Sequence, residues 1–308
     1  MLKPRALSPG DRLAVVAPAS SFKRDEFDDG IQEIRRLGFV PVFDESVFAR
    51  HGAYLAGTPQ LRAQAIHNAW TDRSIAGLIG VRGGYGSAQV LPLLDADVAR
   101  NARKPFIGYS DLTAILTFLT TGCEVVAFHG PMLVGRLGKG EAGYDRASFE
   151  KALGLPEPLG ELAPPGLSVI RKGEARGMLL GGTVTQLLAS LGTPYAFDPP
   201  AGYVLFFEET GERPYRLDRM ATQLRQANLL ARASAIVIGE LNGCDEPSGG
   251  PTAREVIGTL FADFPGPVLF GFPAGHTVGP AITLPLGVDC RVVTERLPRL
   301  VIEEAAVE

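Results

Sequence analysis

Short apolar strands alternate with amphipathic helices through the first third of the chain, and this alternation restricts the fold more than any other feature. The pattern predicts strands over residues 12–17, 39–43 and 75–81, with helices over 28–37 and 59–68 between them. Strand–helix–strand units joined by short loops form parallel sheets with helices on the outside. The sequence therefore predicts an α/β fold built on a parallel sheet.

The segment 104–119 carries the strongest chemical signal. Residues 106–107 predict the end of a buried strand, and the apolar spacing over 112–119 predicts one face of a helix. Ser110 lies between them. A sharp strand-to-helix turn would lift its Oγ out of the sheet and direct the free N–H groups of the helix N-terminus at a developing anion. Ser110 is therefore a candidate nucleophile.

A structural role for Ser110 is the alternative. Serine is a preferred N-cap residue, so its side chain could do no more than cap the helix. The chain also has Leu112 where the G-x-S-x-G pattern of the hydrolase elbow has its second glycine. Both interpretations stay open at this point.

The length and composition of the chain allow more than one domain. Its 308 residues, 45% of them hydrophobic, support one large or two ordinary domains. Residues 154–173 lose apolar periodicity and concentrate proline and glycine, which is typical of a linker. We therefore expect an N-terminal domain over 1–153 and a C-terminal domain over 174–308.

Charge and hydropathy exclude several classes of protein. The net charge of −4 and the absence of a basic run disfavour nucleic acid as a partner. Pro4 and Asp11 interrupt the N-terminal segment where a signal peptide needs an unbroken apolar core. No apolar run reaches the roughly 18 residues of a membrane helix. We expect a cytoplasmic protein with no membrane partner.

No pattern of metal ligands is present. The three cysteines are far apart and form no C-x-x-C pair, so we expect reduced thiols. The four histidines show no H-x-H or H-x-x-x-H spacing. They are His51, His67, His129 and His276. The sequence therefore predicts neither a metal site nor a cofactor.

A glycine-rich segment, Arg82–Ser87, follows the third predicted strand. Bare backbone N–H groups can approach an anion closely, so Gly83 and Gly84 could form an anion or oxyanion cradle. The segment matches neither nucleotide-binding glycine pattern. The alternative is that the two glycines only permit a tight turn.

Three polar residues share one local context, because each follows the end of an apolar strand. They are Ser110, Glu208 and His276. An imidazole can take the proton of a serine hydroxyl, and a carboxylate on its far nitrogen orients the ring. Each also has a simpler explanation, since Glu208 has acidic neighbours and His276 could be an exposed loop residue. His129 is a second possible base at a strand end.

Ten short motifs run nearly end to end along the chain. They are VVAPASS (15–21), YLAGT (54–58), RGGYG (82–86), IGYSD (107–111), HGPM (129–132), GGT (181–183), LGTPY (191–195), LFFEE (205–209), YRLDR (215–219) and GFPAGHT (271–277). Together and in this order they resemble the LD-carboxypeptidase family, serine peptidases that include murein tetrapeptide LD-carboxypeptidases and microcin C immunity peptidases.

The resemblance implies specific catalytic residues. The family nucleophile falls on Ser110, its glutamate on Glu208 rather than Glu209, and its histidine on His276. It also implies an N-terminal flavodoxin-like domain (class I glutamine amidotransferase-like), a C-terminal swivelling β-rich α/β domain and a site between them. Members often form homodimers, and no cofactor is implied.

The resemblance also implies an oxyanion hole, and position in the sequence suggests a residue for binding the substrate. The backbone N–H of Asp111 and that of Gly84 would bind the oxyanion, with Gly83 as the alternative. A carboxypeptidase must bind a free carboxylate, and a guanidinium does so in bidentate fashion. We assign Arg82, beside Gly83, to this role, with Arg216 and Arg219 as alternatives.

One position departs from the pattern, because Thr183 stands where many members have asparagine, which leaves the role of that segment open.

The implied activity is release of terminal D-alanine from murein tetrapeptides during peptidoglycan recycling. The alternative is a microcin-type peptidase acting on aminoacyl-nucleotide analogues. Such enzymes are expected to place a loop aromatic against the nucleobase, and the single tryptophan here is Trp70, before the glycine loop. A non-catalytic two-domain ligand binder is a further alternative.

Overall fold

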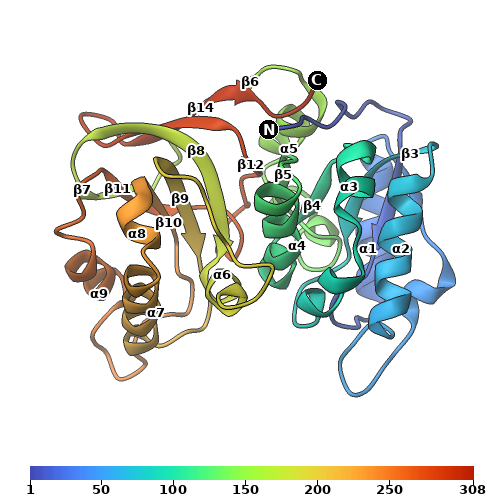
Figure 1. Ribbon diagram of the computed structural model, residues 1–308, viewed down its shortest axis with the longest axis horizontal. Helices are drawn as coiled ribbons and strands as arrows, with labels where there is room; N and C mark the ends of the chain where they lie inside the picture. Colours follow the sequence, from blue (N-terminus) through green and yellow to red (C-terminus); the bar gives the residue numbers. More distant parts are fainter.

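The computed structural model describes residues 1–308 and contains two sheets. Figure 1 shows the N-terminal half, in blue to green, beside the C-terminal half, in yellow to red, with both chain ends at the top. Helix α4 (Thr113–Thr117) lies near the junction of the halves. No helix is both long enough and apolar enough to cross a lipid bilayer.

The first sheet has five parallel strands in the order β2-β1-β3-β4-β5. This is the flavodoxin-like order, in which ligands bind beyond the carboxyl ends of the strands. A sixth strand, β12 (Leu284–Leu286), returns from the end of the chain and pairs antiparallel with β5. The bounds are β1 Arg12–Val16, β2 Val40–Val42, β3 Ile75–Gly80, β4 Phe106–Gly108 and β5 Ala127–His129.

Helices connect these strands, and several begin at polar N-cap residues. Thr58 accepts the N–H of Leu61 at the start of α2, and Asp95 caps α3 in the same way. The helices are α1 Arg24–Arg36, α2 Pro59–Thr71, α3 Ala96–Ala102, α4 and α5 Arg146–Gly154. Short 3-10 turns cover 45–48, 87–89, 91–93, 110–112 and 137–142, and a π turn covers 118–122.

The second sheet has eight strands in the order β6-β14-β13-β8-β9-β10-β11-β7. Its four central strands, β8 to β11, run parallel, and antiparallel strands extend both edges. The bounds are β6 Pro158–Leu162, β7 Ser168–Arg171, β8 Glu174–Thr183, β9 Tyr203–Glu208, β10 Ala233–Gly239, β11 Val268–Phe272, β13 Asp289–Val293 and β14 Arg299–Ala305.

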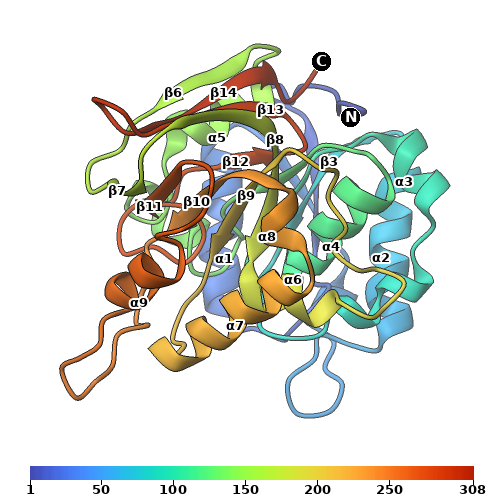
Figure 2. The same cartoon turned by 60° about the vertical axis from the view of Figure 1, so that its left-hand side comes forward.

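The two faces of the second sheet belong to different apolar cores. One face packs against α6 (Val184–Ser190), α7 (Pro214–Gln226), α8 (Leu229–Arg232) and α9 (Ala253–Leu260), and Figure 2 shows α7 and α8 in front of β9. Leu205 and Phe207 point to this side. Val204 and Phe206 alternate with them and join a core shared with the first half. The halves are therefore fused through a common apolar core.

The structure differs from the sequence expectations at several places. The predicted linker, 154–173, contains β6 and β7, which form the two edges of the second sheet. Residues 284–286, expected in the second domain, belong to the first sheet. These pairings join segments far apart in the chain, so local periodicity does not reveal them.

Candidate active site

Ser110 occupies a strained turn at the carboxyl end of β4. The strand ends at Gly108, Tyr109 is extended, and Ser110 has a φ of 61°. A non-glycine residue in this left-handed region is uncommon and costs about 1–3 kcal/mol. Strain of this kind persists where the surrounding structure holds a side chain in a required position.

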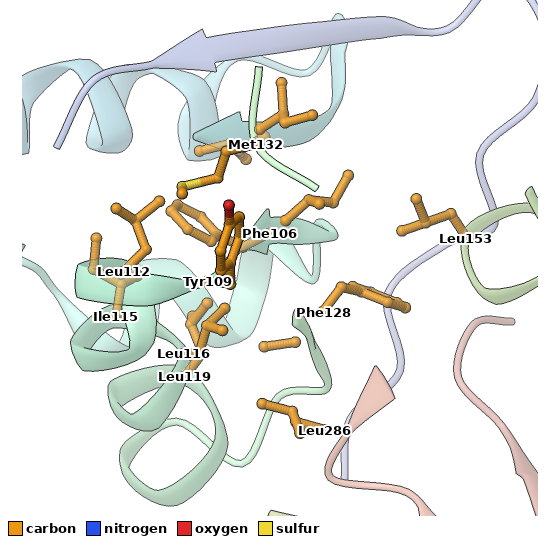
Figure 3. Packing of buried hydrophobic residues seen from close by; sticks show 14 of the residues in the cluster. Phe106, Tyr109, Leu112, Ile115, Leu116, Leu119, Phe128, Met132, Leu153 and Leu286 are labelled. Carbon is orange, nitrogen blue, oxygen red and sulfur yellow. The ribbon is translucent and has the colours of Figure 1, made fainter. Parts of the chain in front are cut away.

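The hydroxyl of Ser110 does not cap the following helix. An N-cap residue has extended dihedral angles, and its oxygen accepts an N–H of the first turn. Ser110 has a positive φ, and its Oγ accepts no capping hydrogen bond. The capping role considered from the sequence is therefore wrong. The strand and helix predicted on either side are present, and Figure 3 shows the buried side chains of Phe106, Leu112, Ile115 and Leu116 near Tyr109, the residue before Ser110.

The glycine loop after β3 lies directly against the serine. A Cβ placed on Gly83 would be 2.8 Å from Ser110 Oγ and 3.2 Å from the backbone nitrogen of Asp111. Any side chain at residue 83 would therefore fill the space beside the hydroxyl. A Cβ on Gly84 would instead meet the side chain of Ser20, where Gly84 has a φ of 98°.

The backbone N–H groups of Asp111 and Gly84 have no acceptor within the protein, and neither does that of Gly83, the alternative donor. The carbonyl of Gly83 accepts the N–H of Ser20 at 3.3 Å. Since a trans peptide holds its C=O and N–H in opposite directions, the N–H of Gly84 points away from Ser20. Unpaired N–H groups beside a nucleophile are suitable donors to an oxyanion.

Two buried charged side chains, whose contacts the sequence does not reveal, hold the glycine loop: Asp111, which follows Ser110, and Arg62 of α2. Asp111 Oδ2 accepts the N–H of Ser87 at 2.8 Å. The guanidinium of Arg62 donates to the carbonyl of Gly86 at 2.7 Å. The sequence does contain a signal that marks Arg62 as unusual, because this charged residue lies on the buried face of α2, four residues before Ile66. A charged residue on an apolar stripe is a candidate for a specific contact.

Glu208 and His276 form a hydrogen-bonded pair. Oε2 of Glu208 lies 2.8 Å from His276 Nδ1 and accepts the backbone N–H of the same residue at 2.8 Å. Its other oxygen accepts the hydroxyl of Thr183. Because an ionised carboxylate only accepts, Nδ1 carries the proton and Nε2 keeps a lone pair. An imidazole held in this tautomer can act as a general base.

The carboxyl of Glu208 is kept ionised although it is only 1% exposed. Burial raises its pKa. The hydrogen bonds from His276 and from the Thr183 hydroxyl, with the positive charge of His276 when its ring is protonated, outweigh that effect and hold the pKa below its ordinary value. An ionised carboxylate on Nδ1 can stabilise the imidazolium that forms when Nε2 takes a proton.

Strand parity separates Glu208 from its neighbour. Glu208 follows Phe206 on the side of β9 that faces the first half. Glu209 points to the other side, where its Oε2 accepts the N–H and hydroxyl of Thr185 at 3.0 and 2.6 Å. Glu209 therefore anchors the start of α6 and makes no hydrogen bond to His276.

The imidazole of His276 lies next to the turn that carries Ser110. The ring centroids of His276 and Tyr109, the residue before the serine, are 5.0 Å apart. The N–H of Thr183 also donates to Thr113 Oγ1 at 3.1 Å, which joins the end of β8 to α4. Ser110 and His276 share no hydrogen bond here, and such contacts are often loose without substrate. The fold thus brings all three residues to one junction.

The three arginines considered for a substrate carboxylate have different surroundings. Arg82 is half-buried, and its one side-chain hydrogen bond is a long one, 3.4 Å, to the carbonyl of Ser21. Arg216 is exposed and paired with Glu212 at 2.8 Å. Arg219 is exposed on α7. Of the three, Arg82 alone belongs to the glycine-rich segment, and no carboxylate of the protein pairs with it.

His129 lies behind the pair as a buried imidazole. It is fully buried at the end of β5, and neither ring nitrogen has a hydrogen-bond partner. Its ring packs against Phe206 and Tyr109, with centroid separations of 5.0 and 5.8 Å. Burial lowers the pKa of His129 to about 4, so it is neutral near pH 7. A residue enclosed in this way cannot reach a substrate.

Comparison with known families identifies the chain. The LD-carboxypeptidase N-terminal domain matches residues 13–130, and the LD-carboxypeptidase C-terminal domain matches residues 176–292. The chain belongs to the LD-carboxypeptidase family. Within this LD-carboxypeptidase family, it is 31% identical to a probable murein peptide carboxypeptidase of Bacillus subtilis, over 95% of this chain and 92% of that one. It is also 31% identical to the murein tetrapeptide carboxypeptidase of Pseudomonas aeruginosa, over 86% and 88%.

Solved structures of LD-carboxypeptidase relatives share the fold. The muramoyltetrapeptide carboxypeptidase of Oxalobacter formigenes superposes with a TM-score of 0.84 at 26% identity, over 95% of this chain and 99% of that one. The microcin C7 self-immunity protein MccF superposes with a TM-score of 0.91 at 23% identity, over the whole of both chains. The expected two-part α/β architecture is therefore confirmed.

Proposed function

We propose that this protein is a serine carboxypeptidase that releases terminal D-alanine from murein tetrapeptides in the cytoplasm. The observation that carries the proposal is the Glu208–His276 pair beside the strained turn of Ser110. Relatives named as murein peptide carboxypeptidases, similar over most of their length, support the choice of substrate.

Acylation begins when His276 Nε2 takes the proton of Ser110 Oγ. The oxygen attacks the carbonyl carbon of the amide between the L-configured centre and D-alanine. The N–H groups of Asp111 and Gly84 stabilise the oxyanion of the tetrahedral intermediate. The imidazolium then gives its proton to the amide nitrogen, the C–N bond breaks, and D-alanine leaves.

Deacylation repeats the same steps with water as the nucleophile. His276 takes a proton from water, and the resulting hydroxide attacks the ester carbon of the acyl-enzyme. The proton returns to Ser110 Oγ as the C–O bond breaks, which frees the shortened peptide. Glu208 stays ionised throughout and stabilises the imidazolium in both halves of the reaction.

We assign the terminal carboxylate of the substrate to Arg82. Its guanidinium follows β3 and is adjacent in sequence to Gly83, which contacts the serine. A bidentate pair with a guanidinium beside the glycine loop would select a substrate in which one residue follows the scissile amide.

The test is the substitution Ser110→Ala. We expect kcat on murein tetrapeptide to fall by roughly 10⁴–10⁶, as for removal of other triad nucleophiles, with the folded state intact. Release of D-alanine measured by mass spectrometry gives the rate. Turnover of Ser110→Ala within tenfold of the native rate would exclude this mechanism.

A second candidate function is hydrolysis of microcin-type conjugates, because the chain is also 27% identical to MccF of Escherichia coli over 90% of its length. The single tryptophan disfavours it, since Trp70 is buried in α2 and cannot stack on a nucleobase. Incubation with processed microcin and with murein tetrapeptide in parallel separates the two activities.

A ligand-binding protein without catalytic activity is distinguished by covalent labelling. A serine-directed fluorophosphonate should label the native chain and not Ser110→Ala. Labelling that persists in the variant would show that another residue reacts.

A further inference from the structure

The segment Gly275–Gly279, which carries His276, is held through alternate backbone groups. The N–H of His276 donates to Glu208 and the N–H of Val278 donates to Glu240, at 2.8 and 2.9 Å. The carbonyls that alternate with these N–H groups face the guanidinium of Arg136. Those of Gly275, Thr277 and Gly279 accept from Arg136 at 2.9, 2.5 and 3.0 Å. Carboxylates therefore bind the amides, and one guanidinium binds the carbonyls.

Arg136 comes from the opposite half of the molecule. It follows β5, the strand that neighbours β4 in the first sheet, whereas His276 follows β11 in the second. Arg136 also donates to the carbonyl of Gly143 at 3.2 Å, within its own half. The guanidinium thus joins the histidine segment to the sheet that carries Ser110.

The hydrogen bonds of Arg136 occupy its guanidinium almost completely. Both terminal nitrogens donate two hydrogen bonds each, and all four acceptors are backbone carbonyls. A guanidinium has five N–H groups, so only Nε is left. Arg136 forms no ion pair with a carboxylate of the protein, and it cannot offer a bidentate site to a substrate carboxylate.

We propose that Arg136 is a positioning residue, which holds the imidazole of His276 at the turn that carries Ser110. The proposal rests on the proposed function, in which His276 is the general base. The planar guanidinium is suited to this task, because its donors are fixed relative to one another and can order three carbonyls of one segment at once. The same cation lies near Tyr109, where it opposes the rise that burial causes in the pKa of the phenol.

The first test compares Arg136→Met with Lys139→Met. Lys139 is exposed in the 3-10 turn over 137–142 that follows Arg136, and it makes no hydrogen bond to the histidine segment, so its substitution removes one positive charge only. We expect Arg136→Met to lower kcat by about 10²-fold, the typical effect of a displacement of about 1 Å in a catalytic group. KM should stay within threefold. Lys139→Met should leave both constants unchanged.

Arg136→Lys separates geometry from charge. Lysine keeps the cation but has no rigid fork of donors, so it can order fewer carbonyls. We expect kcat between those of the native protein and Arg136→Met. The Arg136→Lys variant also tests the positioning role if Arg136→Met fails to fold. A kcat of Arg136→Lys within twofold of native would show that the ordered fork is unnecessary and would overturn the proposal.

A readout independent of turnover is the proton on His276 Nδ1. Held by Glu208, it should give a low-field proton NMR signal that is absent from His276→Ala. We expect the signal to broaden or vanish in Arg136→Met while the melting temperature stays near that of Lys139→Met. An unchanged signal together with unchanged kcat would overturn the positioning role. If Ser110→Ala were fully active, the proposed function would fail, and the NMR signal would still test the contact between Arg136 and the histidine segment.

Discussion

At the scale of single residues, one step along a strand separates two glutamates with different tasks. Glu208 and Glu209 are both buried, but Glu208, the last residue of β9, and Glu209, which follows it, point to opposite sides of the sheet. The first meets His276 and the second meets Thr185. Burial raises the pKa of Glu209, which has no histidine partner, whereas that of Glu208 is lowered. The pKa values of these adjacent carboxyls thus shift in opposite directions because their hydrogen-bond partners differ.

This difference predicts unequal effects of the same substitution. Glu208→Gln removes the charge that stabilises the imidazolium and allows the wrong tautomer, so kcat should fall by about 10⁴-fold. Glu209→Gln keeps an acceptor for Thr185 and should leave kcat within threefold of native. Steady-state rates of the two variants, with melting temperatures as a check on folding, test the assignment. Equal losses in both variants would contradict it.

Thr183 acquires a role that its sequence motif left open. Its hydroxyl donates to Glu208 and its N–H donates to Thr113 at 3.1 Å. The position where many family members have asparagine therefore lies behind the carboxylate in this protein. A hydroxyl is sufficient here because Glu208 needs one more donor on its second oxygen.

At the scale of elements, the loop between β3 and the following 3-10 turn leaves open the space beside the hydroxyl of Ser110. The backbone of Gly83 passes so close to Ser110 that a methyl group would contact its Oγ. Two hydrogen bonds also hold the loop, because Asp111 accepts the N–H of Ser87 and Arg62 donates to the carbonyl of Gly86. Its position is therefore fixed relative to the nucleophile turn.

The prediction at this scale is that Gly83→Ala impairs catalysis without unfolding the protein. The added Cβ would occupy the space 2.8 Å from the hydroxyl, where a substrate carbonyl must approach. We expect kcat/KM to fall by at least about 10²-fold, comparable to loss of an oxyanion donor. Gly122→Ala, where a Cβ would make an ordinary 3.6 Å contact, is the control. Native kcat/KM in Gly83→Ala would show that the site lies elsewhere.

At the scale of the whole molecule, the two halves share one apolar core, and His129 is enclosed in it. The ring lies between Tyr109 of the first half and Phe206 of the second. Burial lowers its pKa from 6.5 to about 4. The unfolded chain therefore binds a proton below pH 6.5 that the folded protein rejects, so stability is lost as the pH falls.

This enclosure predicts an acid-sensitive fold. Between pH 6.5 and 4 the free energy of unfolding should decrease by up to ~3 kcal/mol on account of His129, from 1.36 kcal/mol for each unit of pKa shift. Denaturant unfolding across this pH range, for the native protein and for His129→Asn, tests the effect. The variant should show a flatter dependence above pH 4.5, where carboxyl titration contributes little. Identical slopes would mean that His129 is not the group responsible.

Local pattern was enough to identify the alternating strands and helices, the turn around Ser110 and the strand ends that carry Glu208 and His276. These features depend on neighbours a few residues apart, and apolar periodicity records them directly. The motifs that resemble the family added the role of each residue, which periodicity could not supply.

Contacts between distant parts of the chain could be seen only in the tertiary structure. Three features join parts of the chain that are distant in sequence. They are the pairing of β12 with β5, the edge strands within residues 154–173, and the hydrogen bonds from Arg136 to the segment Gly275–Gly279. No local pattern marks such a pair, because each partner is stabilised only when the other is in place. The chemistry of single residues could thus be read from the sequence, whereas their convergence followed from tertiary packing.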